Sequence, residues 1–400
     1  MATADRTTRT EQIRALLVCN DGDYFVRHRL GVATRLSSIG ADVTVIAGGK
    51  PIPARSVQGW RYIHSHIERF RFAPVSDFVL MARTARAIWL LKPDAVQLIT
   101  LKPTIFSGIA SVACHLLCGY PKRILVTLPG LGRMMSRPKR PGERHYPIGT
   151  AFTLLIVWIL ARFDCVHFTF ETRHDFEFWS SKGIASNENS SIIDGAGVDP
   201  ELFYPSRISR SNSKTKIIFA SRLLRPKGLG VFLMAARQLA NRPDVQFIVA
   251  GMSDDQDPDS FRPEYLRQLN EICFLGYVGD MPSLLRNCDI VCLPTRYGEG
   301  IPRILIEAAA TGLASIVSDH PGCCEVVENG VTGQILSAFS DFEMSQELSV
   351  AVVEYLENPE RLKEHKQAAY RHFRSRKFNE DACVARFIDL LGIDSAASSK

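Results

Sequence analysis

Short runs of apolar, β-branched residues alternate along the chain with longer segments, such as FVRHRLGVATRLSSIG, whose apolar positions have helical spacing. This rhythm is typical of parallel sheets covered by helices. Six runs come first, and the rhythm restarts after the polar stretch 206–216. The runs are IRALLVC, DVTVIAG, AVQLIT, RILVTLP, CVHFTF and SIIDGAG, then IIFASRL, VQFIVAG, CFLGYVG, DIVCLPT and ASIVSD. The pattern predicts an α/β protein with two Rossmann-like domains.

The same pattern suggests where the domains divide. We assign residues 1–205 to the first domain and 206–375 to the second, with 206–216 as the linker. The chain is helical in pattern from Pro359 to Leu391 without a new strand, so we expect residues 376–400 to form a helix that returns to the first domain. Neither domain carries a complete GxGxxG fingerprint, which disfavours an oxidoreductase-type dinucleotide fold.

Three loops of the second domain contain residues suited to a phosphate group. Parallel-sheet domains bind ligands beyond the carboxyl ends of their strands, and each of these loops follows such a strand. The first contains Arg222 and Lys227, and the others are GEGIPR (298–303) and HPGCCE (320–325). Cations beside a helix N-terminus hold phosphate well, and glycines allow close backbone approach. Together the loops indicate a diphosphate site.

The second of these loops leads into a helix that carries an unexpected carboxylate. In RYGEGIPRILIEAAATG (296–312), Glu299 lies beside the glycines and Glu307 lies within the apolar stretch. A buried carboxylate requires a partner, either from the chain or from a ligand. Treated as positions on one helix, the two glutamates lie on roughly the same face. Sugar and ribose hydroxyls could donate to them, so a sugar nucleotide would satisfy both the carboxylates and the diphosphate site.

These motifs resemble those of a known family. GEGIPRILIEAAATG is similar to the Glu-x7-Glu motif of retaining glycosyltransferases of family 4, and ASRLLRPKG is similar to their Arg-x4-Lys signature. GAGVDPELFYP, FLGYVGDMP and HPGCCEVVENGVTG extend the likeness, which spans the chain and is most specific in its second half. The resemblance implies the GT-B fold, in which two Rossmann-like domains face each other across a cleft. Glu171 and Cys324 depart from the family's sequence pattern. Members of the family more often have an amide side chain at the position of Glu171 and an arginine at the position of Cys324.

The resemblance also implies roles for individual residues. Arg222 and Lys227 would neutralise the donor diphosphate and Glu299 would contact the transferred sugar, which makes these three the catalytic residues. Glu307 would bind the ribose. The other donor-binding residues that it implies are Gly276 and Tyr277 near the base, Gly298, and Gly300 and Ile301 through their backbone.

Three motifs of the first half resemble those of the subgroup that builds bacterial polysaccharides on a polyprenyl-diphosphate carrier. They are DYFVRHRL (23–30), ITLKP (99–103) and TLPGLG (127–132). The resemblance places Asp23, His28, Lys102 and Gly130 on the acceptor side. His28 is equally well interpreted as a structural histidine on the first helix.

The charge of the chain is concentrated in its first half. Residues 1–205 hold 25 Lys and Arg against 17 Asp and Glu (+8), and residues 206–400 hold 23 against 25 (−2). A basic loop carries Arg133, Arg137, Lys139, Arg140 and Arg144, and it is either simply solvated or in contact with an anionic partner. The apolar run 151–161 that follows fits a buried helix or one that enters a membrane interface.

These features predict a cytoplasmic protein that is peripherally associated with the inner face of the cell membrane. The polar start MATADRTTRTEQ lacks a secretory signal, and no run is long enough to span a membrane. We expect an anionic membrane surface as a partner and no nucleic acid. The ten cysteines are scattered without a CxxC framework, which argues against a zinc or disulfide scaffold.

Asp21-Gly22-Asp23 has the DxD spacing of metal-dependent transferases. Two carboxylates alone form an incomplete metal site, and Arg222 with Lys227 can perform the cation's work. We therefore predict no metal and no cofactor other than the substrate, a nucleotide sugar for which a UDP-sugar is the expected form.

The predicted function is a retaining glycosyltransferase that moves a hexose or N-acetylhexosamine to a polyprenyl-diphosphate-linked saccharide. Its product would serve exopolysaccharide, capsule or O-antigen synthesis. Two alternatives remain open at this point. One is a UDP-sugar epimerase or hydrolase of GT-B fold, and the other is a non-catalytic scaffold that binds sugar nucleotides.

Overall fold

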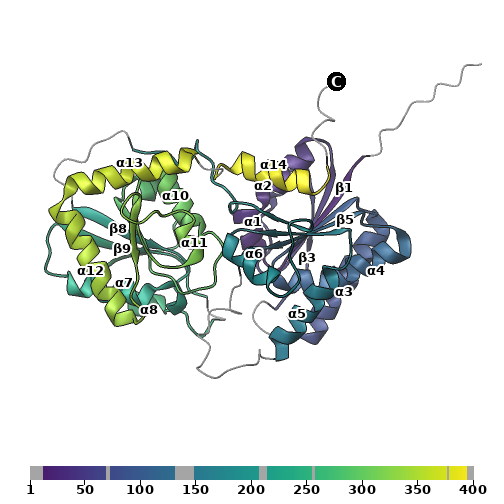
Figure 1. Cartoon of the computed structure of the whole chain (residues 1–400), viewed down its shortest axis with the longest axis horizontal. Helices are drawn as coiled ribbons and strands as arrows, with labels where there is room; N and C mark the ends of the chain where they lie inside the picture. The colour runs from purple at the N-terminus through teal and green to yellow at the C-terminus, as the bar shows by residue number, and fades with distance from the viewer. Residues whose placement is uncertain are drawn as a thin grey trace, which may run out of the picture.

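The protein folds into two parallel-sheet domains that are joined side by side (Figure 1). The basic segment 131–147, most of the predicted linker and the last residues of the chain lie outside the part that the structure, a computed structural model, describes. The described residues are 12–68, 73–130, 148–206, 214–254, 257–375 and 378–393.

The first sheet has the strand order β3-β2-β1-β4-β5-β6-β7, and its neighbouring strands are parallel. Its central strands are buried along almost their whole length because helices cover both faces, which explains their continuous apolar sequences. The strands are β1 (Arg14–Cys19), β2 (Asp42–Ala47), β3 (Arg61–His64), β4 (Ala95–Ile99), β5 (Arg123–Leu128), β6 (Val166–Phe170) and β7 (Ser190–Ile192).

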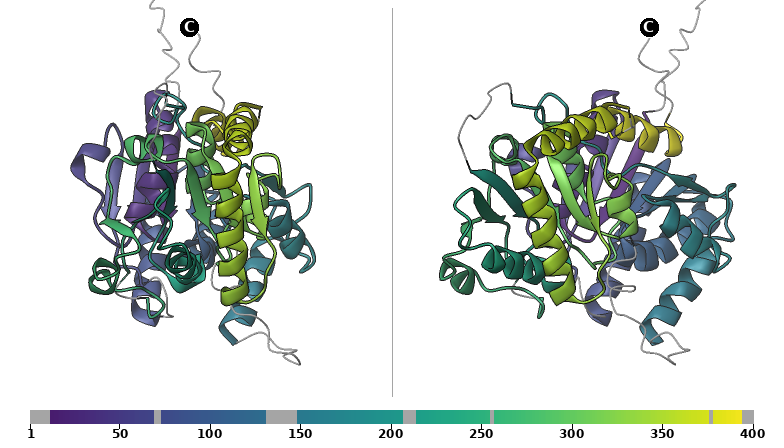
Figure 2. Two further views of the ribbon diagram at one scale, coloured as in Figure 1. Left: turned by 90° about the vertical axis from the view of Figure 1, so that its left-hand side faces the viewer. Right: turned by 60° about the vertical axis from the view of Figure 1, so that its left-hand side comes forward.

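Alternate residues of β1 enter two separate cores. Leu16 and Val18 pack into the core beneath α3, whereas Ala15 and Leu17 pack into the core beneath α2 and the C-terminal helix α14. The expected return of the C-terminal helix to the first domain is thus confirmed, and Figures 1 and 2 show α14 beside α2. The first-domain helices are α1 (Gly22–His28), α2 (Leu30–Ser38), α3 (Pro74–Leu91), α4 (Gly108–Cys118), α5 (Ile148–Leu160) and α6 (Arg173–Ser180), and α14 is Glu380–Leu390.

The helical stretch predicted after β1 is divided in two. Arg29 separates α1 from α2, because its backbone (φ −138°, ψ 2°) does not continue the helix. Its side chain is fully buried and turns toward Glu171 at the end of β6. A tertiary contact therefore sets this break, which helical periodicity alone does not reveal.

The second sheet has the order β10-β9-β8-β11-β12-β13. β8 already includes Thr215 and Lys216, so the predicted linker 206–216 is too long by these two residues. The strands are β8 (Thr215–Ala220), β9 (Val245–Ala250), β10 (Cys273–Gly276), β11 (Ile290–Leu293), β12 (Ala314–Ser318) and β13 (Gly333–Leu336). The helices are α7 (Leu229–Gln238), α8 (Pro263–Arg267), α9 (Met281–Arg286), α10 (Arg303–Thr311), α11 (Pro321–Cys324), α12 (Asp341–Glu357) and α13 (Pro359–Ser375).

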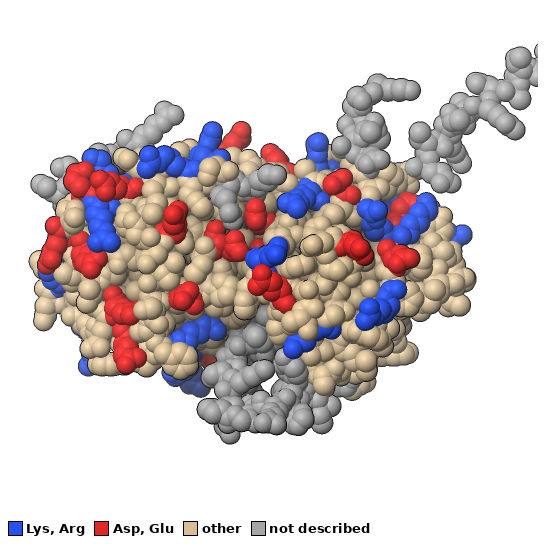
Figure 3. All heavy atoms as spheres, viewed as in Figure 1, with Lys and Arg blue, Asp and Glu red and all other residues tan. Residues whose placement is uncertain are grey.

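Charged side chains are distributed unevenly over the two domains. Figure 3 shows acidic side chains gathered over the second domain, in the left half of the view. Among the described residues, no helix has both the length and the apolar character needed to cross a membrane. Helix α5 is buried along one side only, since Val157 and Leu160 are buried while Leu155 and Trp158 are exposed.

Candidate functional site

Lys227 lies at the carboxyl edge of the second sheet, in the turn after β8. A 3-10 turn (Arg225–Lys227) ends at Gly228, which has a φ of 84°. Any Cβ at Gly228 would overlap the carbonyl oxygen of Pro294, so the turn requires glycine. Lys227 is consequently directed inward, and its side chain is only 8% exposed.

Lys227 forms an ion pair with Glu299. Glu299 lies in the loop between β11 and α10, and Thr295 Oγ1 donates a hydrogen bond to its Oε1 at 3.0 Å. Burial lowers the pKa of Lys227, and the neighbouring Glu299 carboxylate opposes that shift. The structure therefore brings together two of the three residues predicted to be catalytic, in a place where water does not screen their charges.

Arg222 is the third residue predicted to be catalytic, and it lies near the same aromatic ring as Lys227. The guanidinium of Arg222 lies 5.4 Å from the ring centroid of Tyr297, and Lys227 Nζ lies 4.9 Å from the same centroid. Sequence reasoning missed Tyr297, although its place two residues before Glu299 was a usable signal. Two cations over one ring form a positive site that suits a diphosphate.

The partner of Glu307 is Arg303, one helical turn earlier. Arg303 Nε donates to Glu307 Oε1 at 2.9 Å, and burial raises the pKa of Glu307 while Arg303 opposes that shift. The i, i+4 spacing could have revealed this pair. The prediction that Glu299 and Glu307 share one helix face is wrong, because α10 begins at Arg303 and Glu299 belongs to the loop before it.

The loop 298–302 packs directly against the first domain. The Gly300 amide donates to the carbonyl oxygen of Pro129 at 3.2 Å, and the Ile301 amide donates to Glu171 Oε2 at 3.1 Å. Gly130 follows at a φ of 109°, and a Cβ there would overlap the backbone of Glu299 and Gly300. Gly130, predicted on the acceptor side, is thus in contact with residues predicted on the donor side.

His28 also lies at the domain interface, at the end of α1. Its ring stacks on Tyr24 with 4.3 Å between centroids. Burial lowers the pKa of His28 well below its usual range, and the guanidinium groups of Arg303 and Arg29 lower it further. The imidazole is therefore neutral at physiological pH, as a proton acceptor would need to be.

The other two predicted acceptor-side residues have different surroundings. Asp23 is in the first turn of α1, but the carboxylate that caps this helix is that of Asp21, which accepts from the Tyr24 amide at 2.7 Å. Lys102 Nζ donates to the buried carboxylate of Asp77 at 2.7 Å, and this bond ties it to the first turn of α3. Within the described residues, no group of three or more His, Cys, Asp or Glu side chains is placed to hold a metal ion.

Gly276 and Tyr277, which were predicted to lie near the base, are the last residue of β10 and the residue after it, at the outer strand of the second sheet. Gly276 has a φ of 65°, a Cβ added there would meet no atom within 4 Å, and Tyr277 is 69% exposed. Because the sheet is parallel, both lie at the same edge as Arg222 and Lys227. Their position leaves the Tyr277 ring accessible to a planar group.

His320 is a further residue that sequence reasoning did not select. It precedes α11, and its buried Nδ1 has no hydrogen-bond partner in the described part of the chain. Burial lowers the pKa of His320, and the Glu299 carboxylate acts against that shift. Cys324, one of the departures from the family pattern, is exposed, and its Sγ lies 3.5 Å from Asp319 Oδ1.

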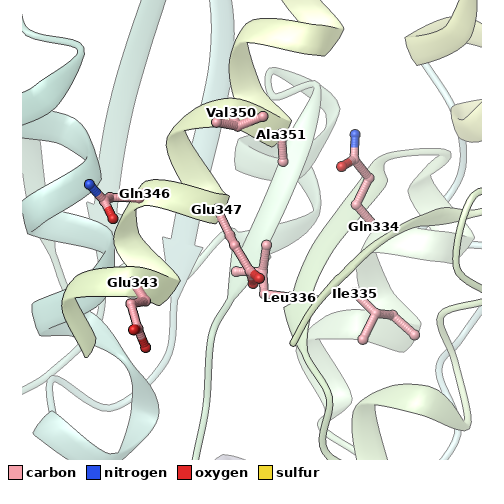
Figure 4. Close-up of a pocket in the computed structure, with 8 residues that line it drawn as sticks. All are labelled: Gln334, Ile335, Leu336, Glu343, Gln346, Glu347, Val350 and Ala351. Carbon is pink, nitrogen blue, oxygen red and sulfur yellow. The ribbon is translucent and has the colours of Figure 1, made fainter. Parts of the chain in front are cut away.

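A surface pocket elsewhere in the second domain contains none of the predicted site residues. It lies between the edge strand β13 and helix α12, as Figure 4 shows. Its Glu347 carboxylate accepts hydrogen bonds from the Ser337 and Ala338 amides, and its Glu343 carboxylate accepts from the Ser340 amide, so both acidic groups of the pocket already have partners. The lining residues are Gln334, Ile335, Leu336, Glu343, Gln346, Glu347, Val350 and Ala351.

Comparisons with known proteins relate the second domain to a family and to named relatives. Residues 204–372 match the family model described as glycosyl transferases group 1. The chain is 28% identical over 194 residues to the N,N'-diacetylbacillosaminyl-diphospho-undecaprenol alpha-1,3-N-acetylgalactosaminyltransferase of Campylobacter jejuni, which covers 46% of this chain and 50% of that protein. It is 31% identical over 146 residues to the phosphatidyl-myo-inositol mannosyltransferase of Mycobacterium tuberculosis, and this match covers 36% of this chain and 38% of that protein. The chain thus spans half or less of the length of these curated relatives.

A solved structure resembles the whole chain. The crystal structure of Anabaena Alr3699/HepE in complex with UDP and glucose aligns with a TM-score of 0.72 and 18% identity, covering 95% of this chain and 100% of that one. The predicted GT-B fold, with its two Rossmann-like domains, is confirmed.

Proposed function

We propose that this chain is a retaining glycosyltransferase that moves a hexose or N-acetylhexosamine from a UDP-sugar to a polyprenyl-diphosphate-linked saccharide, in exopolysaccharide, capsule or O-antigen synthesis. The observation that supports this most is the convergence of Arg222, Lys227 and Glu299 at one sheet edge. The relative from Campylobacter jejuni is named for an undecaprenol-diphosphate acceptor, and the Anabaena structure contains UDP.

In the proposed reaction, Arg222 and Lys227 bind the diphosphate and stabilise the negative charge that develops on it. Glu299 exchanges its bond with Lys227 for hydroxyls of the transferred sugar, and Glu307 accepts from the ribose. The acceptor oxygen bonds to the anomeric carbon on the face from which the diphosphate leaves. The hydroxyl proton passes to the departing diphosphate, so configuration is retained and no metal is required.

The test is release of nucleotide from a panel of UDP- and GDP-sugars, with and without membrane extract that contains polyprenyl-diphosphate saccharides. We expect acceptor-dependent release from a UDP-sugar, with the product's anomeric configuration retained by NMR, and loss of release in Glu299→Ala. Release without acceptor would instead favour an epimerase or hydrolase. Donor binding without turnover would favour the scaffold.

We further propose that the outer face of α3 and α5 attaches the first domain to an anionic membrane. On α5, Phe152, Leu155 and Trp158 are 40–54% exposed. On α3, Phe78 and Trp89 are 63% and 61% exposed, and the intervening exposed residues include Arg83 and Arg86. Helices that lie in a membrane interface typically expose apolar side chains such as Trp, Phe and Leu on one face and carry Lys or Arg on the polar face.

Replacing Leu155 and Trp158 by aspartate should therefore release the protein from membranes. Each side chain buried in the interface contributes about 1.5–3 kcal/mol, so we expect at least about a tenfold loss of affinity per substitution. The measurement is cosedimentation with vesicles that contain anionic phospholipid. Val350→Asp, at a similarly exposed site on the second domain, is the matched control. Equal binding by both variants would contradict the proposed surface.

A further inference from the structure

Glu171 is a first-domain residue whose carboxylate reaches the loop 298–302 of the second domain. It follows β6, and its side chain is 8% exposed. One oxygen, Oε2, accepts from the Ile301 amide at 3.1 Å, and the other, Oε1, accepts from Arg29 Nη2 at 3.2 Å. Gly300 packs against it so closely that a Cβ there would overlap the carboxylate. The carboxylate is therefore fitted between an arginine and the loop.

Arg29 connects this carboxylate to other parts of the first domain. Its side chain has no exposed surface, its Nη1 donates to the His28 carbonyl oxygen at 2.7 Å, and its guanidinium lies 4.6 Å from the ring centroid of Phe387 in α14. A buried ion pair of this kind is not in itself a strong stabilising device, because desolvation offsets most of the attraction. The pair instead orients the Glu171 carboxylate, because Arg29 binds Oε1 and leaves Oε2 against the Ile301 amide of the loop.

Two amides of the loop are thereby occupied by the first domain. Gly300 N–H is bound to Pro129 and Ile301 N–H to Glu171. Pro302 has no amide to offer. The amides that a donor phosphate or sugar oxygen would need, next to Lys227 and Glu299, are thus held by acceptors of the protein itself. A donor can bind them only by replacing those acceptors.

We propose that Glu171 is a positioning residue that occupies the Ile301 amide until a sugar nucleotide replaces it there. The inference rests on the proposed function, since it names the donor as the competitor. Glu171 stabilises the contact between the domains in the absence of donor, and donor binding requires that this contact be exchanged. Donor affinity is therefore set partly by a first-domain residue that does not touch the donor.

The test compares Glu171→Gln with the wild type. Glutamine retains an acceptor but binds the amide more weakly than a carboxylate does, so we expect about tenfold tighter binding of the UDP-sugar by calorimetry and a correspondingly lower donor KM. A merely structural role for Glu171 would raise KM or lower kcat together with the melting temperature. Unchanged or weaker donor binding by a folded variant would overturn the proposal. Glu177→Gln, at an exposed carboxylate on α6, is the control.

Because Glu171→Gln leaves Arg29 without its carboxylate, a second variant, Arg29→Gln with Glu171→Gln, removes both charges together. It should also bind donor more tightly, and failure to do so while folded would overturn the proposal. Small-angle X-ray scattering of the ligand-free proteins requires no nucleotide and should show a larger radius of gyration in both variants. If the wild type binds no sugar nucleotide while the variants still expand, the proposed function has failed and the Glu171 contact stands. Equal radii would overturn the contact itself.

Discussion

Replacing Lys227 by methionine is expected to lower kcat/KM for the sugar nucleotide by about 10- to 150-fold. The reason is that a hydrogen bond to a charged phosphate contributes about 1.5–3 kcal/mol, and each 1.4 kcal/mol corresponds to a factor of ten. Lys227 is buried beside Glu299, so no solvent cation takes its place. The measurement is initial-rate kinetics of nucleotide release across donor concentrations. Wild-type kcat/KM in a folded variant would contradict the role.

The same substitution also leaves the Glu299 carboxylate without its cation. Removing one partner of a buried pair destabilises a protein by up to about 3–5 kcal/mol, so thermal unfolding must be measured alongside. Lys227→Met combined with Glu299→Gln removes both charges and should recover much of the stability but none of the activity. Lys363→Met, at an exposed lysine of α13, controls for the loss of a positive charge.

Replacing Gly322 by alanine is expected to reduce turnover by about 100-fold. A Cβ at Gly322 would overlap the carbonyl oxygen of Gly300, so the loop 298–302 must shift to admit it. A displacement of about 1 Å in a positioning element can lower the rate about 100-fold. The effect is measured as the change in kcat, and calorimetry measures donor affinity alongside it.

The matched control for this substitution is Gly279→Ala in the same domain. Neither glycine has a positive φ, and an added Cβ at Gly279 meets only Tyr277 Cε1, at 4.0 Å. The comparison therefore isolates overlap with the loop from the general effect of adding a methyl group. If the two alanine variants had equal turnover, the loop would not be held by Gly322, and the site geometry described above would be wrong.

The fold could be predicted from the sequence because its signals are local. The alternation of β-branched and amphipathic segments depends on neighbouring residues, and parallel strands buried on both faces leave a continuous apolar run. Most strands of the two sheets and the return of α14 followed from that pattern, whereas the edge strands β3 and β13 did not. The division of the first helix did not, because Arg29 ends α1 through a buried contact with a residue 142 positions away.

Candidate residues could be selected from sequence for a similar reason. Arg222, Lys227 and Glu299 each follow a strand, and parallel topology places those strand ends at one edge. Their partners were less predictable. Arg303 was missed despite its helical spacing from Glu307, and the assumption that Glu299 continues that helix failed because Pro302 precedes its first residue.

By itself, the sequence determined the two parallel-sheet domains, the glycine and basic turns at their strand ends, and the residue types suited to a sugar nucleotide. Only the tertiary structure decided that Lys227 pairs with Glu299, that Gly130 lies against Gly300, and that Glu171 holds the Ile301 amide. The physical reason is the distance along the chain over which each interaction acts. Periodicity and turn chemistry act over a few residues, whereas a buried carboxylate takes whichever donor the packed domains bring to it, however distant in the chain.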